Sequence, residues 1–325
     1  MSSLRANIAR SPSEMDRIAP LWNNILQSQA HTIFQSFAWN RLAAHIFGDR
    51  GTPKVLWLES DVGAAIIPAV IDNATRQLEL LGDALFDYRD VLHAGDREIL
   101  RMAWQQLANY KMPLRVRALE QSAATERWPE FPISLFARAP RVDRSIIDEQ
   151  GFRVAHSRLG RQMRRLEKLG VSFRRVPGAN SAAVRHLYDC KRAHFAADTG
   201  NLFLDQRRCD FMVAAAALHE SRCELFTLEA AGGTLVAGIV TFRDGDVRRC
   251  YTTYFHPDWA HYSPGVTLLF EVTARSLGEG LSCDYMTGEY PYKLRLANAS
   301  RLLYNVDLSA QQLAQVAAGP ISRVA

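Results

Sequence analysis

The stretch from Cys250 to Leu277 constrains the fold of this chain more than any other. Cys250–Phe255 is a run of aromatic and β-branched residues, which is typical of a strand. A short loop over His256–Ser263 follows it. Apolar residues then recur at helical spacing, at Val266, Leu269, Phe270, Thr273 and Leu277. The pattern therefore predicts a strand that runs through a short loop into a helix.

The first turn of the expected helix contains Pro264 and Gly265. Proline at this position loses no useful hydrogen-bond donor, and glycine allows another group to approach the backbone closely. Free amides at the positive end of a helix dipole favour phosphate, so Ser263, Pro264, Gly265, Val266 and Thr267 form a candidate phosphate loop. An ordinary helix start, with Ser263 as its capping residue, is the alternative that the local sequence leaves open.

Composition indicates two folded domains and an anionic partner. The chain has 325 residues, of which 48% are hydrophobic, and a net charge of +5. It lacks a run of about twenty apolar residues and an apolar secretion signal, so we expect no membrane insertion and a cytoplasmic location. The five cysteines show no metal-ligand spacing, so we expect them to be reduced and expect no metal site.

The order of elements divides the chain into four parts. We expect an N-terminal domain over 1–120, a proline-containing connector over 121–150, a C-terminal domain over 151–310 and a tail over 311–325.

The two expected domains contain a similar order of elements. In each, an apolar strand ends in glutamate, passes through a glycine turn and returns as a second apolar strand. The repeat favours two similar α/β halves with mixed sheets, although any two apolar hairpins share some of this likeness.

The second half also contains a strongly basic expected helix over 155–169. Its leucines and methionine lie on one face, and its other faces carry Arg158, Arg161, Arg164, Arg165 and Lys168. Such a face is either simply solvated or holds an anionic ligand. Further along, three strands form a meander, and Leu281–Met286 is expected to lie beside strand 246–256, because the intervening helix makes a crossover.

Three stretches together resemble the acetyltransferase domain of the cellulose-biosynthesis (CelD-like) branch of the GNAT superfamily. They are Arg161–Gly170, Tyr262–Leu269 and Asp284–Lys293. The first half, including Leu81–Asp83 and Asp87–Asp90, resembles the usual N-terminal half of the same proteins. The resemblance implies two tandem GNAT-like folds, an architecture shared with Fem-type transferases. It also implies acyl transfer, of which acetyl is the first candidate, from acyl-coenzyme A to an amine or hydroxyl of a small molecule or sugar.

Acyl transfer from a thioester needs a bound donor and a route for protons. We expect the phosphate loop, Tyr254 and Lys293 to hold acetyl-CoA or another acyl-CoA. The candidates for proton transfer are Asp284, Glu289, His256 and Tyr292. In the first half, Asp87, Tyr88 and Arg89 are candidates for binding the acceptor, with a local ion pair as the competing explanation.

Two other functions remain open at this stage. One is a Fem-like aminoacyltransferase that uses aminoacyl-tRNA, which the basic helix favours. The other is a catalytically inactive binding protein, because in the loop at 260–265 only Gly265 agrees with the usual phosphate-loop pattern of the superfamily. Apart from tRNA, we expect no nucleic-acid partner, since no helix-turn-helix pattern occurs.

Overall fold

A computed structural model describes residues 5–61, 63–121, 127–128, 130–177 and 180–319. The chain divides into two compact units. Unit 1 comprises residues 1–137 and 302–325, and unit 2 comprises residues 138–301. The chain passes between the units within β7 (Ser134–Val142) and again within β13 (Ala299–Leu308).

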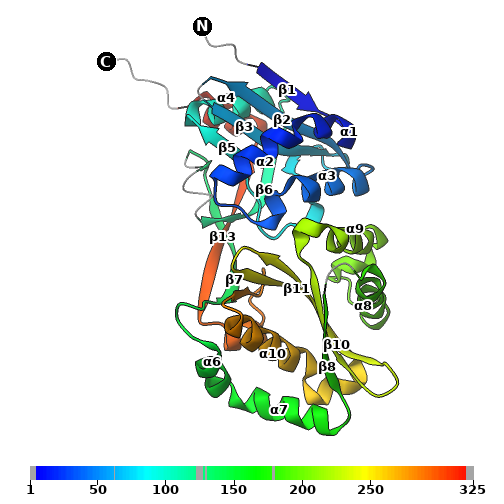
Figure 1. Ribbon diagram of the computed structural model, residues 1–325. Coiled ribbons are helices and arrows are strands. Elements are labelled where there is room, and N and C mark those ends of the chain that lie inside the picture. The colour runs from blue at the N-terminus through cyan, green and yellow to red at the C-terminus, as the bar shows by residue number, and fades with distance from the viewer. Residues whose placement is uncertain (1–4, 62, 122–126, 129, 178–179, 320–325) are drawn as a thin grey trace. The chain divides into compact units, whose positions relative to one another are not determined.

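Unit 1 is a mixed sheet with helices on both faces (Figure 1). Its strands follow the order β1, β2, β3, β4, β6, β13, and β5 also pairs with β3. Their bounds are β1 (Arg5–Ala9), β2 (Gly51–Ser60), β3 (Gly63–Asp72), β4 (Leu78–Leu80), β5 (Leu92–Gly95) and β6 (Leu114–Glu120). The β2–β3 hairpin expected from the sequence is present, although Val62 in its turn lies outside the described residues.

Successive residues of β2 point into two different cores of unit 1. Leu56 and Leu58 pack with α4 (Arg97–Ala108) and α12 (Ala310–Ala318), whereas Val55 packs with α2 (Ala19–Ser28). Two further helices, α1 (Pro12–Met15) and α3 (Phe37–Ile46), complete the described helices of this unit. Because both faces are covered, the middle of β2, Val55–Leu58, is a continuous apolar run.

Unit 2 contains the strand–loop–helix that the sequence predicts. Its strands follow the order β7, β12, β11, β10, β9, β8. Their bounds are β8 (Ser172–Pro177), β9 (Glu224–Glu229), β10 (Leu235–Asp244), β11 (Val247–Phe255) and β12 (Ser282–Asp284). The three-stranded meander is confirmed, and β12 lies parallel to β11 as expected.

The sheet of unit 2 is covered by helices on both faces (Figure 1). One core contains side chains of α6 (Glu149–Ala155), α7 (Ser157–Lys168) and α10 (Pro264–Gly278). α8 (Ser181–His194) packs on β10 so closely that a Cβ at Gly238 would lie 2.5 Å from Leu187 Cδ1. The remaining helices of this unit are α9 (Gln206–Ala217) and the short α11 (Pro291–Leu296).

Two parts of the expected layout need correction. Residues 134–142, placed in the connector, form β7, because the stretch Ser134–Val142 pairs through its second half with β12 at Val142 and Cys283. Residues 311–318, placed in the tail, belong to helix α12, which Ser309 caps and which buries Leu313 and Ala317. Neither element has a regular hydrophobic pattern, since β7 lacks strict alternation and contains Pro140, and α12 is rich in alanine.

The mixed α/β class predicted from the sequence is confirmed. No helix in the described part of the chain is long and apolar enough to cross a bilayer. Over the same residues, no cluster of three or more His, Cys, Asp or Glu side chains is arranged to hold a metal ion.

Candidate active site

β11 and β12 are neighbours along only part of their length. Their parallel pairing covers Val247–Arg249 on β11, and β12 ends at Asp284, whereas β11 continues to Phe255. The amide of His256 donates to Val236 O of β10 at 2.8 Å. Because backbone groups of a strand alternate in direction, those of Phe255 and Thr253 face the opposite, open edge.

A β-bulge precedes the open edge. The register between β10 and β11 shifts at Val240 and Thr241, whose partners are Thr252 and Cys250, so that Tyr251 is the extra residue. A bulge bends its strand and increases the local twist. It lies just beyond the last residue of β11 that pairs with β12, where the two strands begin to separate.

The first turn of α10 leaves two backbone amides without a protein acceptor. Ser263 adopts φ 49°, ψ 47°, and its side chain makes no capping hydrogen bond, so the ordinary cap considered from the sequence is not formed. Pro264 has no N–H, and Thr267 N donates to Ser263 O at 3.1 Å. Among the described residues, Gly265 N and Val266 N have no such partner. These two amides and the helix dipole form a site suited to an anion.

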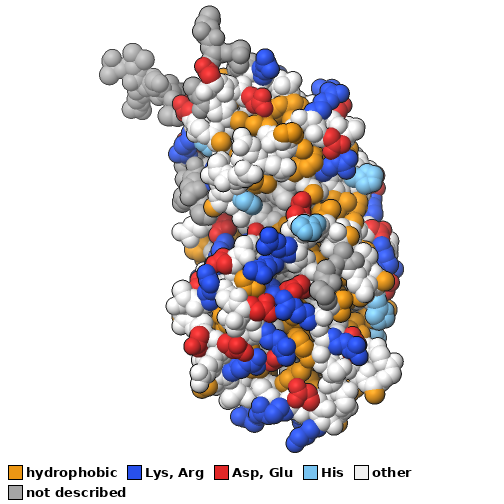
Figure 2. All heavy atoms as spheres, viewed as in Figure 1, with side chains coloured by type: hydrophobic (Ala, Val, Ile, Leu, Met, Phe, Trp, Pro, Cys, Tyr) orange, Lys and Arg blue, Asp and Glu red, His pale blue; other side chains and the backbone are white. Residues whose placement is uncertain are grey.

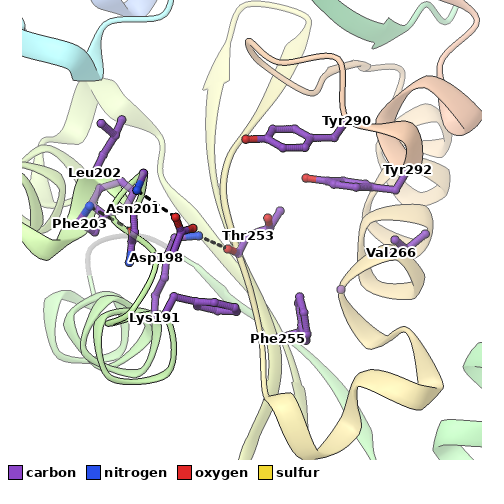
Figure 3. A pocket seen from close by; sticks show the side chains of 13 residues that line it. Lys191, Asp198, Asn201, Leu202, Phe203, Thr253, Phe255, Val266, Tyr290 and Tyr292 are labelled. Carbon is purple, nitrogen blue, oxygen red and sulfur yellow. Dashed lines mark hydrogen bonds between the residues drawn. The ribbon is translucent and has the colours of Figure 1, made fainter.

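A cavity of about 410 Å³ joins the open strand edge to this helix start (Figure 3). Three segments meet there: the end of β11, the first turn of α10 and the segment leading into α11. A fourth wall comes from α8 and the chain that follows it. The lining residues are Lys191, Phe195, Asp198, Gly200, Asn201, Leu202, Phe203, Thr253, Phe255, Gly265, Val266, Tyr290 and Tyr292. All of them belong to unit 2.

Lys191 enters this cavity from the last turn of α8. Its Nζ donates to Thr253 O at 2.8 Å, on the open edge of β11 (Figure 3). Burial lowers the pKa of Lys191 to about 8, against the nearby carboxylate of Asp198, which raises it. A lysine so placed changes charge within the range in which enzymes commonly work.

Tyr290 and Tyr292 form the opposite wall. Their rings stack with centroids 6.0 Å apart, and in Figure 3 both hydroxyl groups point into the cavity. Burial raises the pKa of Tyr292, against a hydrogen bond with Thr253 that lowers it. Of the four residues considered for proton transfer from the sequence, Tyr292 is the one that lines this cavity.

Asp284 lies in the core instead. It is 1% exposed, and one carboxylate oxygen accepts from Arg249 Nη1 at 2.7 Å. The other oxygen accepts from Met286 N at 2.8 Å. Both oxygens are thus engaged. The pair with buried Arg249 links β12 to β11 at the point where the two strands begin to separate.

The other two proton-transfer candidates lie outside the cavity lining. Glu289 is about half exposed and lies 4.0 Å from Arg138 Nε. His256 packs against His194, with ring centroids 4.7 Å apart, and its Nδ1 accepts from Asp258 N at 3.3 Å. His256 directly follows Phe255, which lines the cavity, and therefore lies near the edge of the cavity.

Two residues expected to bind the donor are also buried. Tyr254 is 1% exposed, and its hydroxyl contacts His194 Nδ1 at 2.7 Å, on the face of β11 turned away from Thr253. Lys293 donates through Nζ to Thr287 O at 2.7 Å and supports the backbone before Tyr290. Their contacts shape the walls rather than the interior of the cavity.

The candidate acceptor residues Asp87, Tyr88 and Arg89 lie in unit 1. Tyr88 is 1% exposed and Arg89 8% exposed, and Arg89 Nη1 donates to Leu80 O and Leu81 O. Burial of the guanidinium lowers the pKa of Arg89. This arrangement gives Tyr88 and Arg89 a structural role, while Asp87 is half-buried.

Sequence reasoning missed most of the wall contributed by α8 and the loop after it. Lys191 near the end of a helix looks like an ordinary partner of the helix dipole. Asp198 and Asn201 look like turn residues, and each does accept a hydrogen bond from a local backbone amide. The sequence contained one indication of a cavity here. Phe255 is an aromatic residue at the exposed end of a buried strand.

Comparison with known proteins supports the reading of unit 2. Residues 153–294 match the family described as acetyltransferase (GNAT) domain. No curated protein matches the chain. The matched segment contains the open strand edge, the start of α10 and every residue of the cavity lining.

Solved structures resemble almost the whole chain. The C-terminal domain of a putative lysylphosphatidylglycerol synthetase from Agrobacterium fabrum has a TM-score of 0.60 at 13% identity, covering 94% of this chain and 95% of that one. FemX has a TM-score of 0.59 at 10% identity, covering 96% and 99%. A tandem GNAT protein from the clavulanic acid biosynthesis pathway has a TM-score of 0.52 at 12% identity, covering 94% and 98%.

At these identities the solved structures establish the fold, and the matched family establishes the type of domain. The CelD-like branch suggested by the sequence is not among these findings. The chain has the tandem GNAT-like fold, its residues 153–294 match an acetyltransferase (GNAT) domain, and it is an acyltransferase.

Proposed function

We propose that the protein transfers an acyl group, with acetyl as the first candidate, from acyl-coenzyme A to an amine or hydroxyl of a small molecule or sugar. The observation that carries the proposal is the meeting, in one cavity, of two open amides at the start of α10 and the open edge of β11. The amides suit a diphosphate, and the strand edge suits an extended chain that carries amide groups.

The donor is expected to run from the helix start to the strand edge. Gly265 N and Val266 N hold the diphosphate, and backbone groups of Phe255 and Thr253 bond the pantetheine arm. A Cβ at Gly265 would lie 3.5 Å from Phe255 Cδ1, which is ordinary contact, so space remains beside this backbone. The thioester then lies near Thr253, Lys191 and Tyr292.

The reaction needs one bond formed and one broken. The acceptor nitrogen or oxygen attacks the thioester carbon, a backbone amide at the strand edge stabilises the oxyanion, and the carbon–sulfur bond then breaks. The departing thiolate takes a proton from the Tyr292 hydroxyl. The raised pKa of this phenol keeps it protonated through the neutral range.

The walls facing the donor fit a small acceptor with an apolar or ring-shaped body. Phe195, Leu202 and Phe203 supply apolar surface, and the Tyr290–Tyr292 stack supplies a flat aromatic one. Asp198 and Asn201 are the polar groups on the same side. Asn201 Nδ2 is buried and has no hydrogen-bond partner among the residues that the structure describes, which leaves a donor for a ligand oxygen.

Calorimetric titration tests the donor assignment. Acetyl-CoA should bind, and S-acetylpantetheine, which carries the same thioester arm without the diphosphate, should bind at least 10-fold more weakly, because it makes no contact with the start of α10. Equal binding of both would contradict the assignment of Gly265 and Val266, and no binding of either would contradict the use of coenzyme A.

A second candidate donor is aminoacyl-tRNA, and the exposed basic face of α7 favours it. Arg158, Arg161, Arg164 and Lys168 are exposed, and basic side chains are visible in Figure 2 in the region where Figure 1 places α7. Gln162 Nε2 donates to Tyr262 O at 2.7 Å, which joins this helix to the loop before α10.

Salt-dependent binding distinguishes this candidate. If tRNA is the donor, its affinity should fall steeply with salt and should drop when Arg161 and Arg164 are changed to Gln. Acetyl-CoA binding with no detectable tRNA binding at 50 mM salt would exclude it.

A further inference from the structure

Two charged side chains that the sequence did not single out line this cavity, Lys191 and Asp198, and the amine of Lys191 is the one that contacts the open strand edge. We propose that Lys191 is the catalytic base of this cavity and that it takes the proton of an attacking amine. The inference rests on the proposed function, because it concerns the same cavity and assumes a thioester donor there.

The position of Lys191 is fixed from the strand edge. Its Nζ donates to Thr253 O at 2.8 Å, and Thr253 lies on the open edge along which the donor is expected to run. A neutral amine that donates one N–H still has its lone pair. The contact with Thr253 therefore holds the nitrogen next to the expected thioester and leaves its basic site available.

Charged and titratable groups face Lys191 from three sides. Asp198 lies in the loop after α8, Lys293 in α11, and the phenols of Tyr290 and Tyr292 on the opposite wall. Burial has the largest effect and lowers the pKa of Lys191 to about 8, Asp198 raises it, and Lys293 lowers it. About half of the molecules then carry a neutral lysine at pH 8.

The lowered pKa of Lys191 favours an amine over a hydroxyl group as the acceptor. An alkylammonium ion loses its proton near pH 10, close enough to Lys191 for direct transfer, whereas water has a pKa of about 15.7 and alcohols lie in a similar range. Asp198 lies on the same wall as Lys191, opposite the two tyrosines (Figure 3), and its carboxylate attracts an incoming ammonium ion.

The step balances without a further reagent. The proton of the acceptor ammonium passes to Lys191 Nζ, and the freed nitrogen forms a bond to the thioester carbon. As the carbon–sulfur bond breaks, Tyr292 gives its proton to the thiolate, and the second proton that the acceptor nitrogen loses passes to the Tyr292 oxygen. Lys191 then releases the first proton to solvent. The products are an amide, coenzyme A with its thiol restored and one proton, and both Lys191 and Tyr292 are again neutral.

Lysine labelling tests whether Lys191 lies in the donor site and loses its proton near pH 8, and it needs no knowledge of the acceptor. The chain has five lysines, Lys54, Lys111, Lys168, Lys191 and Lys293. Trace acetic anhydride at pH 6 to 11, followed by peptide mass spectrometry, gives the ionisation midpoint of each. We expect Lys191 to titrate near pH 8, and we expect acetyl-CoA to protect Lys191 from labelling but not exposed Lys111. A Lys191 midpoint equal to that of Lys111 would overturn the proposal.

Two variants test whether Lys191 acts as the base and whether the acceptor is an amine. Lys191→Arg retains a donor for Thr253 O but cannot lose its proton, and Lys191→Met removes both functions. Coenzyme A release from acetyl-CoA is followed with phenethylamine, tyramine and their matched alcohols as acceptors. Wild-type enzyme should use the amines and increase its rate up to about pH 8, and both variants should lose at least 100-fold in kcat. Lys111→Met is the control.

The outcomes separate this inference from the proposed function. If wild-type protein fails to bind acetyl-CoA, the donor assignment fails. If it binds acetyl-CoA and Lys191→Arg matches wild type with an unchanged pH profile, only the role of Lys191 fails. Transfer to the alcohols at rates equal to or above those of the amines also overturns the inference. If no probe in either series is acylated, the labelling result alone decides.

Discussion

Thr267 donates twice to Ser263 O, from its amide at 3.1 Å and from its hydroxyl group at 3.0 Å. This double contact closes the first turn of α10, and Ser263, which adopts a left-handed conformation, provides no side-chain cap. Within the described part of the chain, Gly265 N and Val266 N have no backbone acceptor, and we propose that they bind the diphosphate of the donor.

A charge placed at Gly265 should weaken donor binding. Gly265→Glu puts a carboxylate beside the two amides, and we expect acetyl-CoA to bind roughly 5- to 30-fold more weakly, equivalent to about 1–2 kcal/mol. Gly265→Gln has the same shape without the charge and should lose much less. Calorimetry at low and high salt measures both. Equal losses would mean that space rather than charge decides binding there.

Tyr292→Phe should slow turnover without preventing donor binding. It removes the hydroxyl proposed to protonate the thiolate and keeps the ring, so we expect kcat to fall by about 100-fold with the KM for acetyl-CoA within about 2-fold. Tyr290→Phe is the matched control, because its ring is stacked on Tyr292 and it should retain most activity. The assignment is wrong if the two variants lose activity to the same extent.

Asp284→Asn should destabilise unit 2 rather than abolish the chemistry. Asp284 and Arg249 form a buried ion pair, and removing one charge from such a pair typically costs about 3–5 kcal/mol. Urea unfolding should show this loss, while the folded variant should bind acetyl-CoA like wild type. A stable Asp284→Asn protein without activity would restore Asp284 as a catalytic candidate.

Lys191 should also make stability depend on pH. Its pKa is about 8 in the folded protein and 10.5 in its ordinary state, so the unfolded chain binds the proton more tightly between these values. Stability therefore rises with pH across this window, and below pH 8 the full cost of burial applies. The free energy of unfolding of wild type relative to Lys191→Met should rise by roughly 2 kcal/mol from pH 8 to 10.5. Lys111→Met should show no such change relative to wild type.

The sequence was sufficient for the scaffold of the site but not for its chemistry. The run Cys250–Phe255 and the Pro264–Gly265 pair predict a strand and a helix, because their patterns are local. Lys191 and Thr253 are 62 residues apart, and only the packing of α8 on the sheet brings them together. The ion pair of Asp284 could not be predicted for the same reason. Its partner Arg249 is 35 residues away, and no local pattern indicates the pair.

A crystal structure with bound coenzyme A tests the central claim most directly. The account predicts diphosphate oxygens within about 3.2 Å of Gly265 N and Val266 N, with the pantetheine arm along Thr253 and Phe255 and its sulfur near Lys191 and Tyr292. Coenzyme A bound at any other surface, with these two amides still unpaired, would contradict it.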